Sequence, residues 1–278
     1  MLFLSVFIAA PSLAADCQSL KKALKTERNL KQKRKMLSNL IIQCPEDPVI
    51  NYKYALSLER FRKYDKALGY YQKAILLNPQ MGKAYAGMGD VYIYLGMLDE
   101  SIEAYRVARK LMPQSERTGS RLARLEIKRK ALAGGIVSVG EFIQVMDHRG
   151  KISSNRPLLL TGPALQYNVS FVNNTGQLRP TGIRQLAAIG QAMQDDSLKF
   201  VRFEISTYVD ASYSTPQEAL EASKERVHMI KDQLVANFLI DPKRIDIVWY
   251  GDNQPIEVRS FSGSQSLNSR VEFRRLFD

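Results

Sequence analysis

Three prolines constrain the fold of this chain most strongly, because they recur at a fixed interval. Pro45, Pro79 and Pro113 stand 34 residues apart, and each closes an apolar segment with helical periodicity. A period of this length indicates stacked helix-turn-helix units, each burying its apolar face on its neighbours. Further pairs match at the same offset: Ala55 and Gly89, Leu58 and Tyr92, Ala67 and Ser101, Tyr71 and Tyr105, and Ala74 and Ala108.

This pattern resembles the tetratricopeptide repeat, in which small residues let two antiparallel helices approach closely while aromatic side chains fill the adjoining gaps. Nine of the thirteen tyrosines lie between Tyr52 and Tyr105, as such packing requires. The resemblance covers residues 16–114, strongly in two repeats and weakly in the first, where Lys33 occupies the small-residue position. It implies a helical solenoid whose groove holds a peptide or a helix of a partner protein.

The segment after the repeats is predicted to be one more helix, over residues 115–133, which covers the last repeat with Leu122, Leu125, Ile127 and Leu132. Two consecutive glycines at 134 and 135 then end it. We therefore expect a repeat domain over residues 16–133. Residues 134–165 have a mixed pattern with alternation at 136–139, and we expect a linker with possible short strands.

The first fifteen residues predict a secretory signal peptide. They carry no charge, and an apolar run at 2–8 is followed by small residues at the expected cleavage site. Because no Lys or Arg precedes the apolar run, we expect the true start to lie upstream. Asp16 before Cys17 does not fit a lipoprotein signal, so we expect a cleaved export with no transmembrane segment in the mature chain. A buried N-terminal helix is the alternative.

The two cysteines, Cys17 and Cys44, both lie in the first repeat. In an exported protein an isolated pair favours a disulfide over a metal site, since no further ligand stands at a suitable spacing. One cysteine opens the first helix of the repeat and the other ends the second, so an antiparallel hairpin brings them to one end. Two unpaired buried thiols are the alternative if the protein is not exported.

The formal charge of +12 comes largely from one basic stripe near the N-terminus. Such a stripe is typical of nucleic-acid binding, but export argues against that partner and favours anionic envelope surfaces or acidic proteins. The simplest interpretation is a solvated helix face. Its members are Lys21, Lys22, Lys25, Arg28, Lys31, Lys33, Arg34 and Lys35.

The C-terminal part, residues 166–278, alternates between two periodicities. Residues 167–172, 200–208, 244–250 and 270–276 are predicted strands, and residues 180–193 and 216–238 are predicted helices. This order predicts an α/β sandwich in which the helices cover one sheet. The predicted fold class is thus an α-helical solenoid followed by an α/β domain.

Six motifs in this region resemble the OmpA-like peptidoglycan-binding family, and they occur in the family's order over about 110 residues. They are Phe171 with Asn174, Gly176, Gln177 and Leu178; Tyr208-Val209-Asp210; Ala222-Ser223-Lys224-Glu225-Arg226-Val227; Asp241-Pro242-Lys243-Arg244-Ile245; Tyr250-Gly251-Asp252-Asn253-Gln254-Pro255; and Asn268-Ser269-Arg270-Val271-Glu272.

The resemblance implies a site for the diaminopimelate of the peptidoglycan stem, which presents both an ammonium and a carboxylate. Asp210 would accept from the ammonium, and Arg226 would fork onto the carboxylate. Both are expected to converge on one pocket at the sheet edge, supported by Asn268 and Arg270. The alternative is purely structural, with Asp210 capping a helix and Arg226 paired with an acidic neighbour.

Three positions depart from the family pattern: Val209 replaces a threonine, Tyr213 a glycine, and Ser269 the first of two arginines.

Together these features predict a non-catalytic envelope protein, located in the periplasm and associated with the cell wall or outer membrane. Its C-terminal domain would bind peptidoglycan and its repeats an unidentified envelope protein, with no nucleic acid as a partner. The alternative is a scaffold of an envelope complex whose OmpA-like domain no longer binds peptidoglycan. We find no phosphate-binding glycine loop, metal-ligand cluster or nucleophile elbow, so no cofactor or metal is expected.

Overall fold

The computed structural model describes residues 13–147, 162–167, 171–172, 176–209, 213, 215–253 and 269–277. The chain forms two compact units, Met1–Val91 with Ala104–Gln114, and Tyr92–Glu103 with Ser115–Asp278. Most of the predicted signal peptide, residues 1–12, lies outside the described residues. No helix in the described ranges combines the length and the apolar character needed to cross a bilayer.

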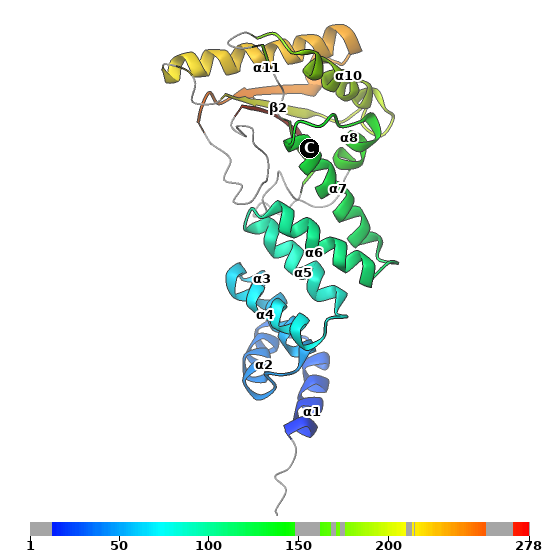
Figure 1. Ribbon diagram of the computed structural model, residues 1–278, viewed down its shortest axis with the longest axis vertical. Helices are drawn as coiled ribbons and strands as arrows, with labels where there is room; N and C mark the ends of the chain where they lie inside the picture. Colours follow the sequence, from blue (N-terminus) through cyan, green and yellow to red (C-terminus); the bar gives the residue numbers. More distant parts are fainter. Residues whose placement is uncertain are drawn as a thin grey trace, which may run out of the picture. The chain divides into compact units, whose positions relative to one another are not determined.

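The repeat region consists of consecutive α-helices, as predicted (Figure 1). Side chains at the helix starts explain where two of them begin, since Asn29 and Asp47 accept hydrogen bonds from the first free backbone N–H groups of the helices that follow. The helices are α1 Leu13–Thr26, α2 Leu30–Gln43, α3 Pro48–Arg60, α4 Tyr64–Leu77, α5 Gly82–Tyr94 and α6 Leu98–Leu111.

Small residues sit where the repeat pattern requires close helix packing. Ala55 on α3 and Ala67 and Ala74 on α4 are fully buried. Tyr71 on α4 is fully buried as well, and its hydroxyl donates to Glu59 Oε2 over 2.7 Å. Gly87 on α5 lies so close to the Tyr71 ring that a methyl group at this glycine would collide with it. The repeat interpretation is therefore confirmed at the level of packing.

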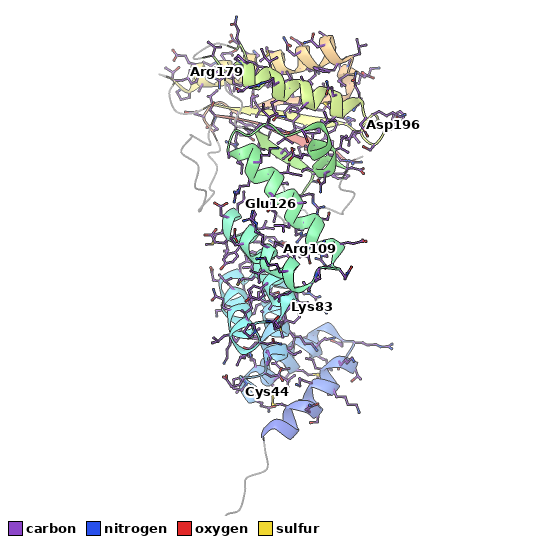
Figure 2. All side chains as sticks on the ribbon, turned by 45° about the vertical axis from the view of Figure 1, so that its right-hand side comes forward. Cys44, Lys83, Arg109, Glu126, Arg179 and Asp196 are labelled. Atoms are coloured by element: carbon purple, nitrogen blue, oxygen red, sulfur yellow. A yellow bond between two sulfur atoms is a disulfide. The ribbon has the colours of Figure 1, made fainter. Side chains whose placement is uncertain are left out.

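The first two helices are joined by the Cys17–Cys44 disulfide, with a Cα–Cα distance of 6.0 Å (Figure 2). Cys17 lies near the start of α1 and Cys44 caps the end of α2, so the pair closes one end of the hairpin. Around it Leu24, Leu40 and Ile50 form a small core. The disulfide predicted from the cysteine positions is thus present.

The second unit contains a four-stranded sheet with strand order β1-β4-β2-β3 (Figure 1). Strand β4 runs antiparallel to both β1 and β2, whereas β2 and β3 are parallel. The elements are α7 Glu116–Leu132, α8 Val139–Met146, β1 Ala164–Tyr167, α10 Pro180–Gln194, β2 Phe203–Tyr208, α11 Pro216–Phe238, the short 3-10 helix η1 Pro242–Arg244, β3 Ile245–Trp249 and β4 Arg270–Arg275.

The two faces of this sheet differ in chemistry. Phe203 and Ile205 of β2, with Phe273 of β4, join one core with residues of α10 and α11. Alternate residues such as Glu204 and Glu272 point to the other face. Figure 1 shows α10 and α11 over the same side of β2. The predicted sandwich, with helices covering one face of the sheet, is confirmed.

Between the repeats and the sheet the structure has a helix where the sequence alternation suggested short strands. Ser138 and Glu141 form a capping box that starts α8, and Phe142 then packs against Phe203 and Phe273. The first strand also begins earlier than predicted, at Ala164, inside the expected linker. The capping box and the packing of Phe142 thus favour a helix here, although four residues alternate as in a strand.

Helix α7 contributes to the core of the second unit. Ile127 and Ala131 on this helix are buried with the sheet residues, and Arg129 pairs with Asp99 at the start of α6. The boundary that we expected after residue 133 and the covering of the last repeat by this helix remain predictions. The buried side chains Ile127 and Ala131 of α7 have their partners in the core of the second unit.

Arg244, just before β3, fastens the end of α10 to the start of β2. Its Nε donates to the Val201 carbonyl, and its Nη2 donates to the Met193 and Leu198 carbonyls over 3.0 and 2.8 Å. Met193 lies in the last turn of α10, whose carbonyls have no partner within the helix. One guanidinium therefore satisfies three carbonyls that the fold leaves without partners in helix or sheet.

We expect Arg244→Lys to lower the free energy of unfolding of the second unit by about 2 kcal/mol, because one ammonium cannot reproduce this fork. The control is Arg202→Lys, which alters an exposed pair with Asp246 and should cost at most about 0.5 kcal/mol. Urea unfolding followed by the fluorescence of Trp249, the one tryptophan in the sequence, measures both. Equal losses in the two variants would contradict the assignment.

Candidate functional site

The centre of the candidate site is Arg226, in the third turn of α11. Thr215 caps this helix and Pro216 occupies its first turn. Arg226 is 7% exposed, although it carries a charge. A buried guanidinium needs hydrogen-bond acceptors or an aromatic face around it, and this one has both.

Arg226 is held by side chains from distant parts of the chain. Its Nη2 donates to Tyr213 Oη over 3.2 Å, and its Nη1 donates to Ser269 Oγ over 3.3 Å. The Phe171 ring lies under the guanidinium, with 4.4 Å from Cζ to the ring centroid. Figure 2 labels Arg179, whose Nε donates to the Phe171 carbonyl over 3.0 Å and so fixes the backbone of that aromatic residue.

Two of the three departures from the family pattern are therefore the hydrogen-bond partners of Arg226. Tyr213 stands where the family has a glycine, and Ser269 where it has an arginine. Both supply a neutral oxygen to the guanidinium. In the sequence alone, Tyr213 and Ser269 are departures from the family pattern, whereas in the structure they hold Arg226 in place.

Asp210 lies outside the described residues, but the chain on both sides of it is placed. Val209 N donates to the Gly251 carbonyl over 2.9 Å, which fixes the residue before Asp210. Three residues after it, Tyr213 contacts Arg226. The distance between Asp210 and Arg226 stays a prediction, while the described residues on either side, Val209 and Tyr213, are bonded to Gly251 and Arg226.

Gly251 connects β2, β3 and α11 next to this segment. Its N–H donates to Ser223 Oγ on α11 over 2.9 Å, and the Ser223 carbonyl accepts from Thr207 Oγ1 on β2 over 2.6 Å. With a φ of +61°, Gly251 adopts the left-handed conformation that L-residues avoid. The turn after β3 thus needs glycine to hold the end of β2 and the Arg226 helix together.

We expect Gly251→Ala to lower the free energy of unfolding by about 2 kcal/mol, because a left-handed alanine is strained and its Cβ would lie 3.1 Å from the Leu220 backbone nitrogen. The matched control is Gly140→Ala in α8, where nothing lies within 4 Å. That change should be neutral or stabilise by up to about 1 kcal/mol, since alanine favours helix. Urea unfolding compares them, and equal effects would refute the role of Gly251.

Arg270, the other arginine of the predicted site, is placed on the opposite face of β4. It is buried, its Nε donates to Glu272 Oε1 over 2.8 Å, and its guanidinium stacks 3.5 Å from the Tyr208 ring centroid. Tyr208 in turn stacks on Tyr250. Glu272 also accepts from Gln166 Nε2, so this face carries a buried polar network.

Electrostatics keeps Tyr208 in this network as a neutral phenol. Burial raises its pKa well above the usual range, and the negative charge of Glu272 raises it further, while Arg270 lowers it. The phenol can therefore donate toward Glu272 Oε2, 3.5 Å away. The described contacts of Arg270 thus support the sheet end from the face opposite α11.

Of the four predicted site residues the structure describes Arg226 and Arg270, and it does not bring these two together. Arg226 meets the segment that begins β4 through Ser269, directly before Arg270. Asn268 lies outside the described residues, so its support of the site is a proposal. In the described ranges no group of three or more His, Cys, Asp or Glu residues is placed to hold a metal ion. The arrangement suits recognition of a carboxylate by a fixed guanidinium.

Parts of this chain are similar to known proteins. The sequence model of the OmpA family matches residues 170–269. No curated protein matches the chain. One similar solved structure is the MamA protein, with 24% identity over 41% of this chain and 65% of that chain and a TM-score of 0.36. Another is the OmpA-like domain of FopA1 from Francisella tularensis, with 15% identity over 41% of this chain and 75% of that chain and a TM-score of 0.33. A third is the periplasmic domain of Helicobacter pylori MotB, with 18% identity over 41% of this chain and 74% of that chain and a TM-score of 0.34. Residues 170–269, which include Arg226, therefore match the sequence model of the OmpA family.

Proposed function

We propose that the C-terminal domain binds peptidoglycan by gripping the diaminopimelate of the peptide stem. Arg226 takes its carboxylate and Asp210 its ammonium, with Asn268 and Arg270 in support. The observation that carries this proposal is the buried guanidinium of Arg226, whose two Nη atoms donate to neutral oxygens, one of them on Tyr213, three residues after Asp210. A guanidinium fixed before the ligand arrives loses less entropy on binding.

The hydrogen bonds of Arg226 to its neutral partners are longer than those a guanidinium forms with a carboxylate. The bonds to Tyr213 and Ser269 measure 3.2 and 3.3 Å, whereas charge-assisted bonds to a carboxylate are about 2.7–2.9 Å. Each bond of the second kind contributes about 1.5–3 kcal/mol, so two or three give micromolar to millimolar recognition. Many sites along one wall polymer would add avidity.

The remainder of the proposal concerns the whole protein. We infer that it is exported, acts at the cell wall or outer membrane without catalysing a reaction, and holds an envelope protein through its repeats. Support comes from the apolar N-terminal segment, the disulfide and the helical array, which offers a binding surface and no catalytic constellation that we can identify.

A scaffold without wall binding is the second candidate, and one observation favours it. Tyr213 and Ser269 each already accept one N–H from the two Nη atoms that a ligand carboxylate would use. If these bonds do not open, Arg226 is a structural residue. Both domains would then serve only to assemble an envelope complex.

Sedimentation with insoluble peptidoglycan sacculi tests the function. We expect the full-length protein to sediment with sacculi, and Asp210→Asn or Arg226→Lys to weaken the apparent affinity at least about tenfold, the equivalent of one lost charged bond. Arg202→Lys, an exposed arginine of the same domain, is the control and should bind as wild type. Failure of the wild type to sediment, or equal binding by all variants, would refute wall binding.

A second pair of changes separates the two candidates. Tyr213→Gly together with Ser269→Arg restores the family pattern and removes both neutral acceptors from Arg226. If the scaffold interpretation is right, the wild type does not bind sacculi and the double variant gains binding. If the tether interpretation is right, the wild type binds already, and the double variant binds no more than severalfold more tightly.

A further inference from the structure

The basic stripe near the N-terminus is not a single solvated face. Lys21 and Lys25 lie four residues apart on α1, Lys33 lies near the start of α2, and Lys53 comes from the next repeat, on α3. Residues four apart share one face of a helix. By contrast, the guanidinium of Arg34 stacks over the Phe61 ring, with 4.0 Å from Cζ to the ring centroid.

Helix geometry brings three of these lysines to one level. The Nζ of Lys21 pairs with Asp47 Oδ2 over 2.6 Å, so the start of α3 lies beside Lys21 on α1. Lys25 is then about 6 Å farther along α1 and Lys53 about 9 Å farther along α3. The Cys17–Cys44 disulfide joins the start of α1 to the end of α2. The start of α2, with Lys33, therefore lies at the other end of the hairpin, beside the end of α1 that carries Lys25.

The electrostatics of Lys53 agrees with this convergence. Burial lowers the pKa of its ammonium, and the positive charges of Lys33, Lys25 and Lys21 lower it further, against a smaller opposing effect of Asp47. Asp47 itself is engaged by Lys21. Within the described part of the chain, no carboxylate forms an ion pair with Lys25 or Lys53.

We propose that Lys25, Lys33 and Lys53, which we call the lysine cluster, form the docking site for an acidic segment of the partner protein. This inference rests on the proposed role of the repeats in binding a protein. Three ammonium groups from three helices, of which Lys25 and Lys53 form no ion pair with a described carboxylate, match two or more carboxylates on one peptide. An acidic segment would relieve their mutual repulsion on binding.

The burial of the cluster favours a peptide over a membrane or wall surface. Lys33 and Lys53 are half-buried, and Lys25 is exposed. The Lys33 ammonium already reaches back to the Glu27 carbonyl, 3.4 Å away. A carboxylate on a peptide side chain can approach half-buried ammonium groups one at a time, whereas the headgroups of a bilayer need charges that project from the protein.

Fluorescence anisotropy with the full-length protein and a labelled hexaglutamate peptide tests the proposal. We expect the triple variant Lys25→Gln, Lys33→Gln, Lys53→Gln to bind at least about tenfold more weakly than the wild type. The matched control removes the same charge from exposed lysines outside the cluster, by Lys31→Gln, Lys35→Gln and Lys66→Gln, and should weaken binding at most about threefold.

Several results would overturn the proposal: no binding of hexaglutamate by the wild type, equal weakening in both triple variants, or equally tight binding of hexaglutamine. Cluster-dependent binding to anionic lipid vesicles without peptide binding would assign the lysines to a membrane instead. The cluster variant should melt at or above the wild-type temperature, because it loses repulsion, and this excludes misfolding as the cause. Sacculus binding by the cluster variant should be unchanged, which separates this test from that of wall binding.

Discussion

Removing the Cys17–Cys44 disulfide is expected to lower the free energy of unfolding of the first unit by about 3 kcal/mol, because the bond closes a loop that the unfolded chain would otherwise leave open. Cys44 is also buried in the small core of the first hairpin, so alanine suits its position better than serine. The variant Cys17→Ser with Cys44→Ala should therefore unfold at lower urea concentration, as followed by circular dichroism.

The controls use the separate optical signals of the two units. Seven of the thirteen tyrosines lie in the first unit, whereas Trp249 reports on the sheet. A reducing agent should destabilise the wild type and leave the double variant unchanged, and the Trp249 transition should move in neither. A wild type whose far-ultraviolet transition ignores the reducing agent would contradict the stabilising role of the bond.

Lys128→Met is expected to change how the stability of the second unit depends on pH. Lys128 on α7 is 3% exposed and donates to the Gly162 carbonyl over 2.7 Å. Burial lowers the pKa of this ammonium well below its usual value, and Arg124 and Arg121 lower it further. The folded state therefore holds this proton less tightly than the unfolded chain does.

The direction in which stability changes with pH follows from that difference in proton affinity. Between the lowered pKa of the folded state and the ordinary pKa near 10.4, the unfolded chain binds the extra proton, so stability rises with pH. In that window the wild type should gain about 1.4 kcal/mol per pH unit relative to Lys128→Met. Below it, the penalty of the buried charge is fully present and the difference is constant.

Urea unfolding followed by Trp249 fluorescence from pH 7 to pH 10 measures this slope. The control is Lys130→Met, two residues away, whose exposed ammonium pairs with Glu141 over 2.8 Å. It should leave the slope unchanged, because its ammonium already lies in solvent. Parallel curves for wild type and Lys128→Met would show that Lys128 keeps its usual proton affinity in the folded state.

Local chemistry in the sequence predicted those parts of the fold that depend on a repeated pattern. The interval between Pro45, Pro79 and Pro113 located the helical hairpins, and the small residues at Ala55 and Ala67 are buried as that packing requires. The order of strands and helices in the second unit followed from the change of periodicity. Each of these signals repeats along the chain, so one ambiguous residue does not alter the prediction.

Two features were not predicted: the helix α8 and the contacts of Tyr213 and Ser269. The alternation at residues 136–139 suggested strands, although the capping pair Ser138 and Glu141 was present in the sequence and starts a helix. Tyr213 and Ser269 looked like losses from a motif, because nothing local shows that their oxygens meet one guanidinium from 13 and 43 residues away.

Calorimetric titration with a soluble peptidoglycan stem peptide tests the central claim most directly. One peptide ends in diaminopimelate, and its counterpart carries lysine, which keeps the ammonium and lacks the side-chain carboxylate. We predict that the wild type binds the diaminopimelate peptide at least about tenfold more tightly than the lysine peptide, and that Arg226→Lys removes most of this preference. Equal affinities of the wild type for both peptides, or no binding of either, would contradict the account.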